Sequence, residues 1–218
     1  MSPEEARWFG SALSHYSVDE LSPLINLGSS SAAYRQTACS EIEQCIFEPL
    51  RKRGVTVYHS DMKNESGVDI VGDILDSRTQ DGIRSLRARS ILCTNILEHV
   101  ANREGFCRVC EDLLPAAGLL LVSVPYRYPY HPDPIDTLFR PDLGQLKRLW
   151  RDLDFVEGKI VSFGNYFRAM RRKKWLIARD AYLVFAGVAK IDRWRVLVGN
   201  YRFLFSRYEA SCAVFRKR

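Results

Sequence analysis

The sequence lacks the segments that direct export or span a membrane. Its first residues, MSPEEARWFG, contain no basic stretch followed by an apolar run, which is the pattern of a signal peptide. No run of about 18 uncharged apolar residues, long enough to cross a bilayer, occurs anywhere in the chain. We therefore expect neither a signal peptide nor a spanning helix, and a cytoplasmic location.

Two glycine-rich phosphate-binding loops are missing as well. The chain contains neither GxGxxG, the dinucleotide-binding pattern, nor GxxxxGK[ST], the pattern of P-loop nucleotide-binding proteins. It also has no internal repeats and no low-complexity linker, which argues against a solenoid or a string of modules. Any nucleotide site must therefore be built in another way.

Cysteine is present but not in the spacing of a zinc site. Only Cys107 and Cys110 form a CxxC pair, and no second pair or nearby histidine completes a ligand set. The pair lies in a helical pattern, where a spacing of three puts both thiols on one face. We expect six free thiols, with these two in the core, and no metal site; a redox or metal role is the alternative.

The composition of the 218 residues, 46% of them hydrophobic, fits one domain over 1–218. Short apolar runs predict strands within 23–31, 55–61, 69–71, 90–94 and 118–124, followed by two more at 155–163 and 208–216. Helical patterns lie between them, over 1–20, up to about 53, over 102–114 and over 142–152. Strands that alternate with helices indicate an α/β fold, a mostly parallel sheet covered on both faces with an antiparallel edge.

Basic residues are concentrated near the end of the chain. Residues 168–218 hold 14 of the 32 Lys and Arg residues but only 3 of the 26 Asp and Glu residues. We expect segment 168–207 to be a helical insertion before the last strand. Its cations and aromatic residues are compatible with solvated packing on the domain, with peripheral contact to a membrane, or, less favoured, with nucleic acid.

Polar residues follow several of the expected strands where they end. Gly28 and three serines close the first strand, and a helix start after such a turn can hold an anion. Asp61 closes the second strand, in the position of the acid that binds ribose in dinucleotide folds. Asp73 follows the third. Acids are also common in ordinary turns, which is the alternative explanation.

The order of these pieces resembles class I S-adenosylmethionine-dependent methyltransferases, and more narrowly the type 11-like members found with polysaccharide biosynthesis. The resemblance rests on PLINLGSSS, VYHSDMKNESGVDIVGDILD, ILCTNILEHV, DLLPAAGLLLVSVP and YPYHPDPIDTLFRP, within about 22–145. It implies a Rossmann-like seven-stranded sheet and S-adenosyl-L-methionine as cofactor. The glycine motif is degenerate, because this chain has NLGSSS where the family has DxGxGxG.

Site residues follow from the same resemblance. The methionine portion of the cofactor would contact Asn26, Gly28 and Ser29, the ribose Asp61, and the adenine Asp73 and Ile74, while Asn95 would lie beside the sulfonium. The acceptor is expected to be a hydroxyl of a glycan or a small molecule. The alternative is a non-catalytic module with this fold that docks through its basic insertion.

Deprotonation of a hydroxyl needs a base that titrates near neutral pH, and two histidines are suitably placed. His99 follows the strand at 90–94, and His131 lies in the loop after 118–124. Substrate contacts are predicted for Tyr126, Asp133, Asp136 and Arg140. The alternatives are that His99 caps or packs and that Asp136 only pairs with Arg140.

Overall fold

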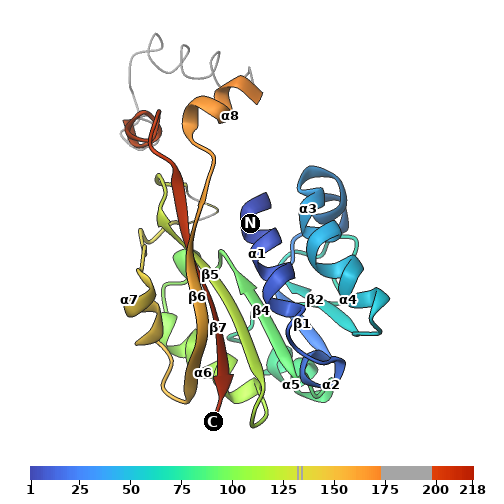
Figure 1. The fold of residues 1–218 in the computed structure, drawn as a ribbon. Coiled ribbons are helices and arrows are strands. Elements are labelled where there is room, and N and C mark those ends of the chain that lie inside the picture. Colours follow the sequence, from blue (N-terminus) through green and yellow to red (C-terminus); the bar gives the residue numbers. More distant parts are fainter. Residues whose placement is uncertain (132, 134, 173–197) are drawn as a thin grey trace.

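A computed structural model describes residues 1–131, 133, 135–172 and 198–218. These residues form a seven-stranded sheet in the order β3-β2-β1-β4-β5-β7-β6 (Figure 1). The strands are β1 Leu24–Leu27, β2 Val57–Asp61, β3 Ile70–Val71, β4 Ser90–Thr94, β5 Leu119–Arg127, β6 Leu153–Phe163 and β7 Tyr208–Lys217. Strands β1 to β5 pair in parallel, and β7 runs antiparallel between β5 and β6. The predicted fold class is confirmed.

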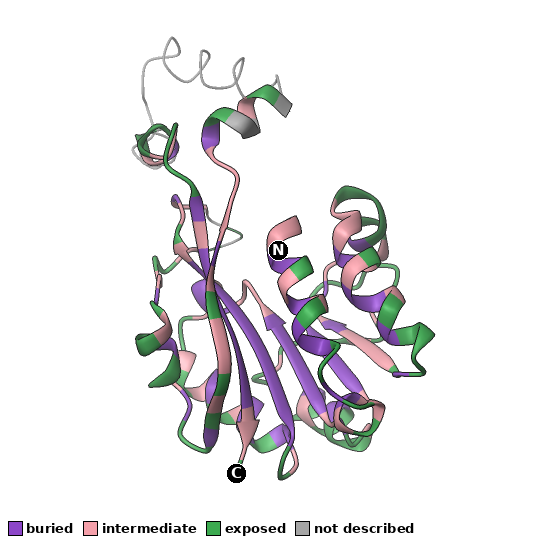
Figure 2. Ribbon diagram, viewed as in Figure 1, coloured by how far each residue is buried: buried purple, intermediate pink, exposed green. Residues whose placement is uncertain are grey.

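Helices cover both faces of the sheet, each over its own core. One face packs against α1 Pro3–Leu13, α2 Val18–Leu21 and α4 Glu48–Lys52, through residues such as Phe9 and Leu50. The other packs against α5 Ser77–Ser85, α6 Arg103–Leu113 and α7 Leu143–Lys147. The central strands are buried along their length, which explains why they are apolar without alternation (Figure 2).

The helices depart from the sequence predictions in their lengths. The expected helix over 1–20 is two helices, because Ser17 starts α2 with a capping box to Glu20. The helix expected to reach about 53 is broken into π-helical turns η1 Tyr34–Ala38 and η2 Glu43–Phe47, the short α3 Ser40–Ile42, and α4. Helix α7 ends at Lys147 rather than 152, and the polar helix α5 was not anticipated.

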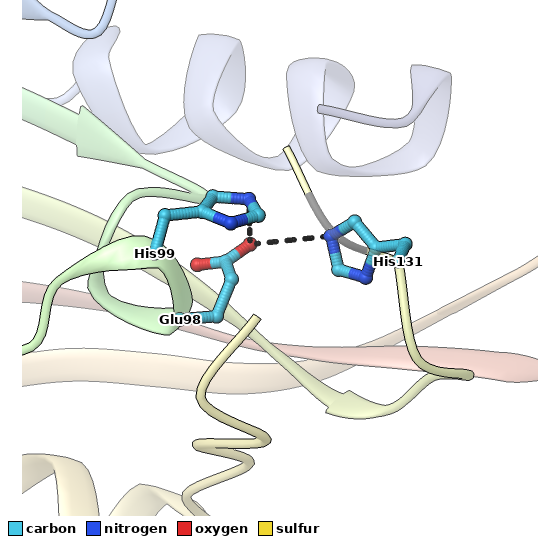
Figure 3. A group of neighbouring side chains, drawn as sticks. All are labelled: Glu98, His99 and His131. Carbon is cyan, nitrogen blue, oxygen red and sulfur yellow. Dashed lines mark ion pairs between the residues drawn. The ribbon is translucent and has the colours of Figure 1, made fainter. Parts of the chain in front are cut away.

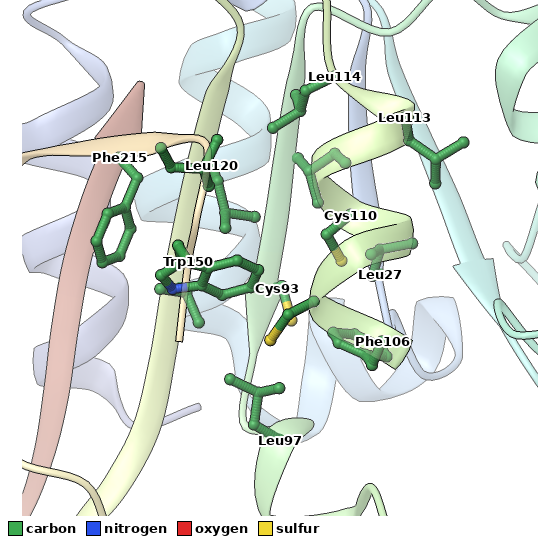
Figure 4. Close-up of a cluster of buried hydrophobic side chains, with 14 of the residues drawn as sticks. Leu27, Cys93, Leu97, Phe106, Cys110, Leu113, Leu114, Leu120, Trp150 and Phe215 are labelled. Carbon is green, nitrogen blue, oxygen red and sulfur yellow. The ribbon is translucent and has the colours of Figure 1, made fainter. Parts of the chain in front are cut away.

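The cysteines behave as small apolar residues. All six are free thiols, as predicted. Cys107 and Cys110 of α6 belong to the same buried cluster as Cys93 of β4. Figure 4 shows Cys110 and Cys93 facing each other between α6 and the sheet, with Trp150 nearby. Burial raises the pKa of each of the three core thiols, which keeps them protonated and unreactive.

The basic segment 168–207 is described only at its two ends. Helix α8, Tyr166–Arg172, follows β6 beyond the end of the sheet, and residues 198–207 lead back into β7 (Figure 1). The centre of the predicted insertion, 173–197, lies outside the described residues. Among the helices that are described, none has the length and hydrophobicity to cross a bilayer.

Candidate functional site

The predicted site residues follow strands whose carboxyl ends lie at one edge of the sheet. Gly28 follows β1, Asp61 ends β2, Asp73 lies two residues after β3, and Asn95 follows β4. The register places Leu27 beside Ser60 and Thr94 beside Ser123, so these strands end at similar heights. In open α/β sheets this edge is where ligands bind.

The turn after β1 is held by hydrogen bonds from its neighbours. Gly28 has a φ of 61°, and a Cβ at that position would lie 2.7 Å from the Ile96 side chain. The next-but-one amide, Ser30 N–H, donates to Asp61 Oδ2 over 2.7 Å. The glycine turn and the acid of β2 therefore contact each other directly.

A buried arginine that the sequence analysis did not single out supports the same turn. Arg35 is 3% exposed, and its guanidinium donates to the carbonyl oxygens of Ser29 (3.0 Å), Ser30 and Gly67 (2.7 Å). These bonds fix the serine-rich turn against the loop before β3. No motif marks this residue in the sequence, where it is one of several cations of the expected helix after the turn.

Asn26, Asp73 and Ile74, which were also predicted to bind the cofactor, form hydrogen bonds with other residues of the protein. Asn26 Nδ2 donates to His59 Nδ1 over 3.1 Å. Asp73 Oδ1 accepts from Leu75 N–H over 2.9 Å, and the carbonyl of Ile74 accepts from Gln80 over 3.1 Å. These bonds shape the turn after β3, and the predicted adenine contacts of Asp73 and Ile74 stay predictions.

Asn95 contacts a second residue that sequence reasoning missed. Glu5 of α1 is 2% exposed, and its Oε1 accepts from Ser123 Oγ (2.8 Å) and Asn95 Nδ2 (3.3 Å). The first turn of α1 is thereby fixed over the ends of β4 and β5. In the sequence, Glu5 carried only the signal of an acid at a helix start.

The two predicted catalytic histidines come together around a buried carboxyl group. Glu98 and His99 lie in η3, Leu97–His99, after β4, and His131 lies in the loop after β5. Glu98 is fully buried, and its Oε1 lies 3.7 Å from His99 Nε2 and 3.9 Å from His131 Nε2 (Figure 3). The two imidazoles meet edge to face with centroids 5.2 Å apart.

Hydrogen bonds on the far side of each ring fix its orientation. His99 Nδ1 contacts the carbonyl oxygen of Ile135, and His131 Nδ1 lies 3.2 Å from that of Pro129 and 3.3 Å from Asp136 Oδ2. Carbonyl and carboxylate oxygens only accept, so each Nδ1 carries the hydrogen. Nε2 of each ring faces Glu98, and it carries a lone pair when the ring is neutral.

The environment changes the acidity of this cluster. Burial raises the pKa of Glu98 to about 8, although a hydrogen bond from its own backbone N–H and the cationic Arg140 oppose the shift. Burial also lowers the pKa of His131, against the hydrogen bond to Pro129 and the charge of Asp136. Groups that exchange protons near neutral pH are suited to acid–base chemistry.

The loop that carries His131 is held by an internal ion pair. Arg140 Nη2 donates to Asp136 Oδ2 over 2.6 Å and to the carbonyl of Pro129 over 3.2 Å. Asp136 also accepts from His131 N–H over 2.9 Å. Asp136 and Arg140 thus hold the loop in place. Tyr126 is half-buried and Asp133 is exposed. The substrate contacts predicted for all four residues stay predictions.

No family model matches the chain, and no curated protein matches it in sequence. Solved structures do match its fold. A coclaurine N-methyltransferase bound to N-methylheliamine and SAH is 15% identical, with a TM-score of 0.53 over 96% of this chain and 69% of that one. A SAM-dependent methyltransferase from Archaeoglobus fulgidus is 12% identical, with a TM-score of 0.50 over 97% and 94%.

A third structural neighbour is described as a cyclase and not as a methyltransferase. The [4+2]-cyclase SpnF is 11% identical, with a TM-score of 0.56 over 97% of this chain and 80% of that one. Identities this low establish the Rossmann-like methyltransferase fold alone. The fold does not identify the reaction, because one fold can carry many different activities.

Proposed function

We propose that the protein is an S-adenosylmethionine-dependent methyltransferase that acts on a hydroxyl group of a glycan or small molecule. One observation carries the proposal. At a single edge of a methyltransferase-like sheet, the Gly28 turn is bonded to Asp61, and the cluster of Glu98, His99 and His131 follows the adjacent strands. The first part suits a nucleoside and the second a group that loses a proton.

The residues around Gly28 fit the proposed cofactor. The glycine has no side chain, so a ligand can approach its backbone closely. Asp61 uses one hydrogen bond on each oxygen, to Ser30 N–H and Lys63 N–H, and a carboxylate has further lone pairs for ribose hydroxyls. When bound, the cofactor supplies an electrophilic methyl group on its sulfonium.

The residues of the cluster would act on the acceptor. Methyl transfer is an in-line displacement, which needs the acceptor oxygen held close to the methyl group. The hydroxyl proton leaves the oxygen as the new bond to carbon forms. The Nε2 atoms of His99 and His131, in their neutral forms, are the candidate proton acceptors, and both lie beside the buried Glu98.

Calorimetric titration with S-adenosylhomocysteine tests the cofactor assignment. We expect binding by the parent and a loss of about tenfold or more in Asp61→Ala, because hydrogen bonds to a charged group contribute about 1.5–3 kcal/mol. The matched control is Asp112→Ala, an exposed acid on α6. Absence of heat at millimolar ligand, or equal affinity in Asp61→Ala and the parent, would overturn the proposal in favour of a non-catalytic module.

A further inference from the structure

The cluster of Glu98, His99 and His131 offers three ligand atoms for a metal ion. One carboxylate oxygen and two imidazole nitrogens lie within 4.8 Å of one another. They come from η3 and from the loop after β5, so they are adjacent in space but not in one sequence motif. Two histidines and one glutamate form a common ligand set of catalytic zinc sites, with a further position left open.

The burial of Glu98 is a second observation that favours a metal site, besides the grouping of the three ligand atoms. Among the described residues, no residue other than Glu98 itself donates a hydrogen bond to its carboxylate oxygens, and both oxygens are shielded from solvent. Its two imidazole neighbours, at 3.7 and 3.9 Å, are beyond hydrogen-bond length. Ionising a buried carboxyl group that has no partners costs several kcal/mol, and a cation bound beside it offsets that cost.

The third observation that favours a metal site is the orientation of the two imidazole rings. Both histidines use Nδ1 to contact oxygen acceptors, from Ile135, Pro129 and Asp136. Metal-bound histidines almost always have such a partner on the nitrogen that does not bind the metal. In the neutral form of each ring, the hydrogen-bond pattern therefore leaves Nε2 with its lone pair on the side of the same oxygen of Glu98.

The spacing is slightly wider than in an occupied site. Ligands at about 2.0–2.2 Å from Zn²⁺ in tetrahedral geometry lie about 3.4 Å apart. The two nitrogen–oxygen separations of 3.7 and 3.9 Å therefore require a contraction of about 0.3–0.5 Å, and the two ring nitrogens, which lie within 4.8 Å of each other, require one of up to about 1.4 Å. Rotation of the two imidazoles about their side-chain torsions would supply it and would bend the contacts at Nδ1.

We propose that Glu98, His99 and His131 form a binding site for a divalent cation of the Zn²⁺ type. Imidazole ligands favour zinc and related transition metals over magnesium and calcium. Three protein ligands leave at least one position for an oxygen ligand. If the proposed function holds, that ligand is the acceptor hydroxyl, which loses its proton to water more readily on the ion, and the two imidazoles then serve as ligands.

Zinc binding can be measured without activity. Untagged protein is stripped of metal with a chelator and titrated with Zn²⁺ against a chromogenic competitor. We expect one ion per chain, and at least a hundredfold weaker binding in Glu98→Gln and in His131→Ala. His15→Ala removes an exposed histidine and Cys39→Ser/Cys45→Ser removes the two half-buried thiols; both variants should bind as the parent does.

Cobalt reports the ligand set directly. Co²⁺ in the site should give visible bands typical of four or five nitrogen and oxygen ligands, without a thiolate charge-transfer band, and these bands should be absent in Glu98→Gln. Circular dichroism confirms that each variant is folded, and His99→Gln provides a second ligand variant. Parent-like zinc affinity in the three ligand variants, or no zinc binding below about 100 μM in the parent, would overturn the site.

The two proposals fail separately. Titration with S-adenosylhomocysteine is repeated with metal-free and zinc-loaded protein. Zinc binding without nucleoside binding would refute the proposed function and leave the metal site. Nucleoside binding without zinc binding would refute the metal site and leave the imidazoles as the proton acceptors.

Discussion

Acidification should destabilise the protein through His59, which lies on β2 beside the glycine turn. Its Nδ1 accepts from Asn26 Nδ2 over 3.1 Å, and its ring packs edge to face on Phe47 with centroids 4.8 Å apart. Burial, and then the cationic Arg35, lower the pKa of His59 from 6.5 to about 4. The folded state therefore holds this ring neutral.

The direction follows from the two pKa values. The unfolded chain takes up a proton at His59 as the pH falls through 6.5, and the folded chain does so only near 4. The contribution of the neutral His59 ring to the free energy of unfolding is thus fully present above pH 6.5, and it is lost as the pH falls from 6.5 to about 4. The full difference corresponds to about 3 kcal/mol, and because the ring is only half-buried we expect about 1–2 kcal/mol.

Urea unfolding at several pH values between 7 and 4.5 checks this expectation. The free energy of unfolding of the parent should fall by about 1–2 kcal/mol more than that of His59→Gln over this range. The variant has lost the ring packing, so its absolute stability at pH 7 is lower and only the pH dependence is compared. His15→Gln, on the surface, should follow the parent. Equal slopes in the parent and His59→Gln would refute the reasoning.

Two further predictions concern the packing that positions the site. Gly10→Ala places a Cβ 2.2 Å from the carbonyl oxygen of Cys45, so α1 must move away from η2. Thermal unfolding should therefore show that the free energy of unfolding falls by about 2–4 kcal/mol. Gly82→Ala is the control: it adds a methyl group in open space on α5, and the free energy of unfolding should rise by about 0.5–1 kcal/mol. Arg35→Lys loses the fork that reaches three carbonyl groups and should cost about 1–3 kcal/mol by urea unfolding, whereas exposed Arg7→Lys should cost almost nothing. Equal effects within either pair would contradict the packing argument.

The strands could be predicted from sequence because the central ones are apolar over their whole length. Strand β4 matches its predicted bounds, and β5 runs three residues past its predicted end, because Pro125 and Arg127 continue its pairing with β7. The helices were harder. Helix α5, SRTQDGIRS, buries only Thr79 and Ile83, so its apolar face is too narrow to stand out.

The site was predictable where its signal is local. Gly28 and Asp61 stand at strand ends, and parallel strands bring their carboxyl ends to one edge of the sheet. The roles of Glu5 and Glu98 depend on contacts that are distant in the chain. Glu5 meets Asn95 across 90 positions, and Glu98 faces His131 only because the loop before Arg140 folds back on η3. No spacing rule carries that information.

Glu98 connects the two proposals made for this edge of the sheet. A leucine-sized apolar side chain at this position would avoid the cost of burying a carboxyl group that receives no hydrogen bond from another residue. The loop nevertheless brings two oriented imidazoles to the carboxyl group, with Arg140 and Asp136 holding one of them. Proteins tolerate such local cost at functional sites. Proton transfer and metal binding use the same Nε2 atoms, so zinc affinity of the parent and of Glu98→Gln separates the two roles.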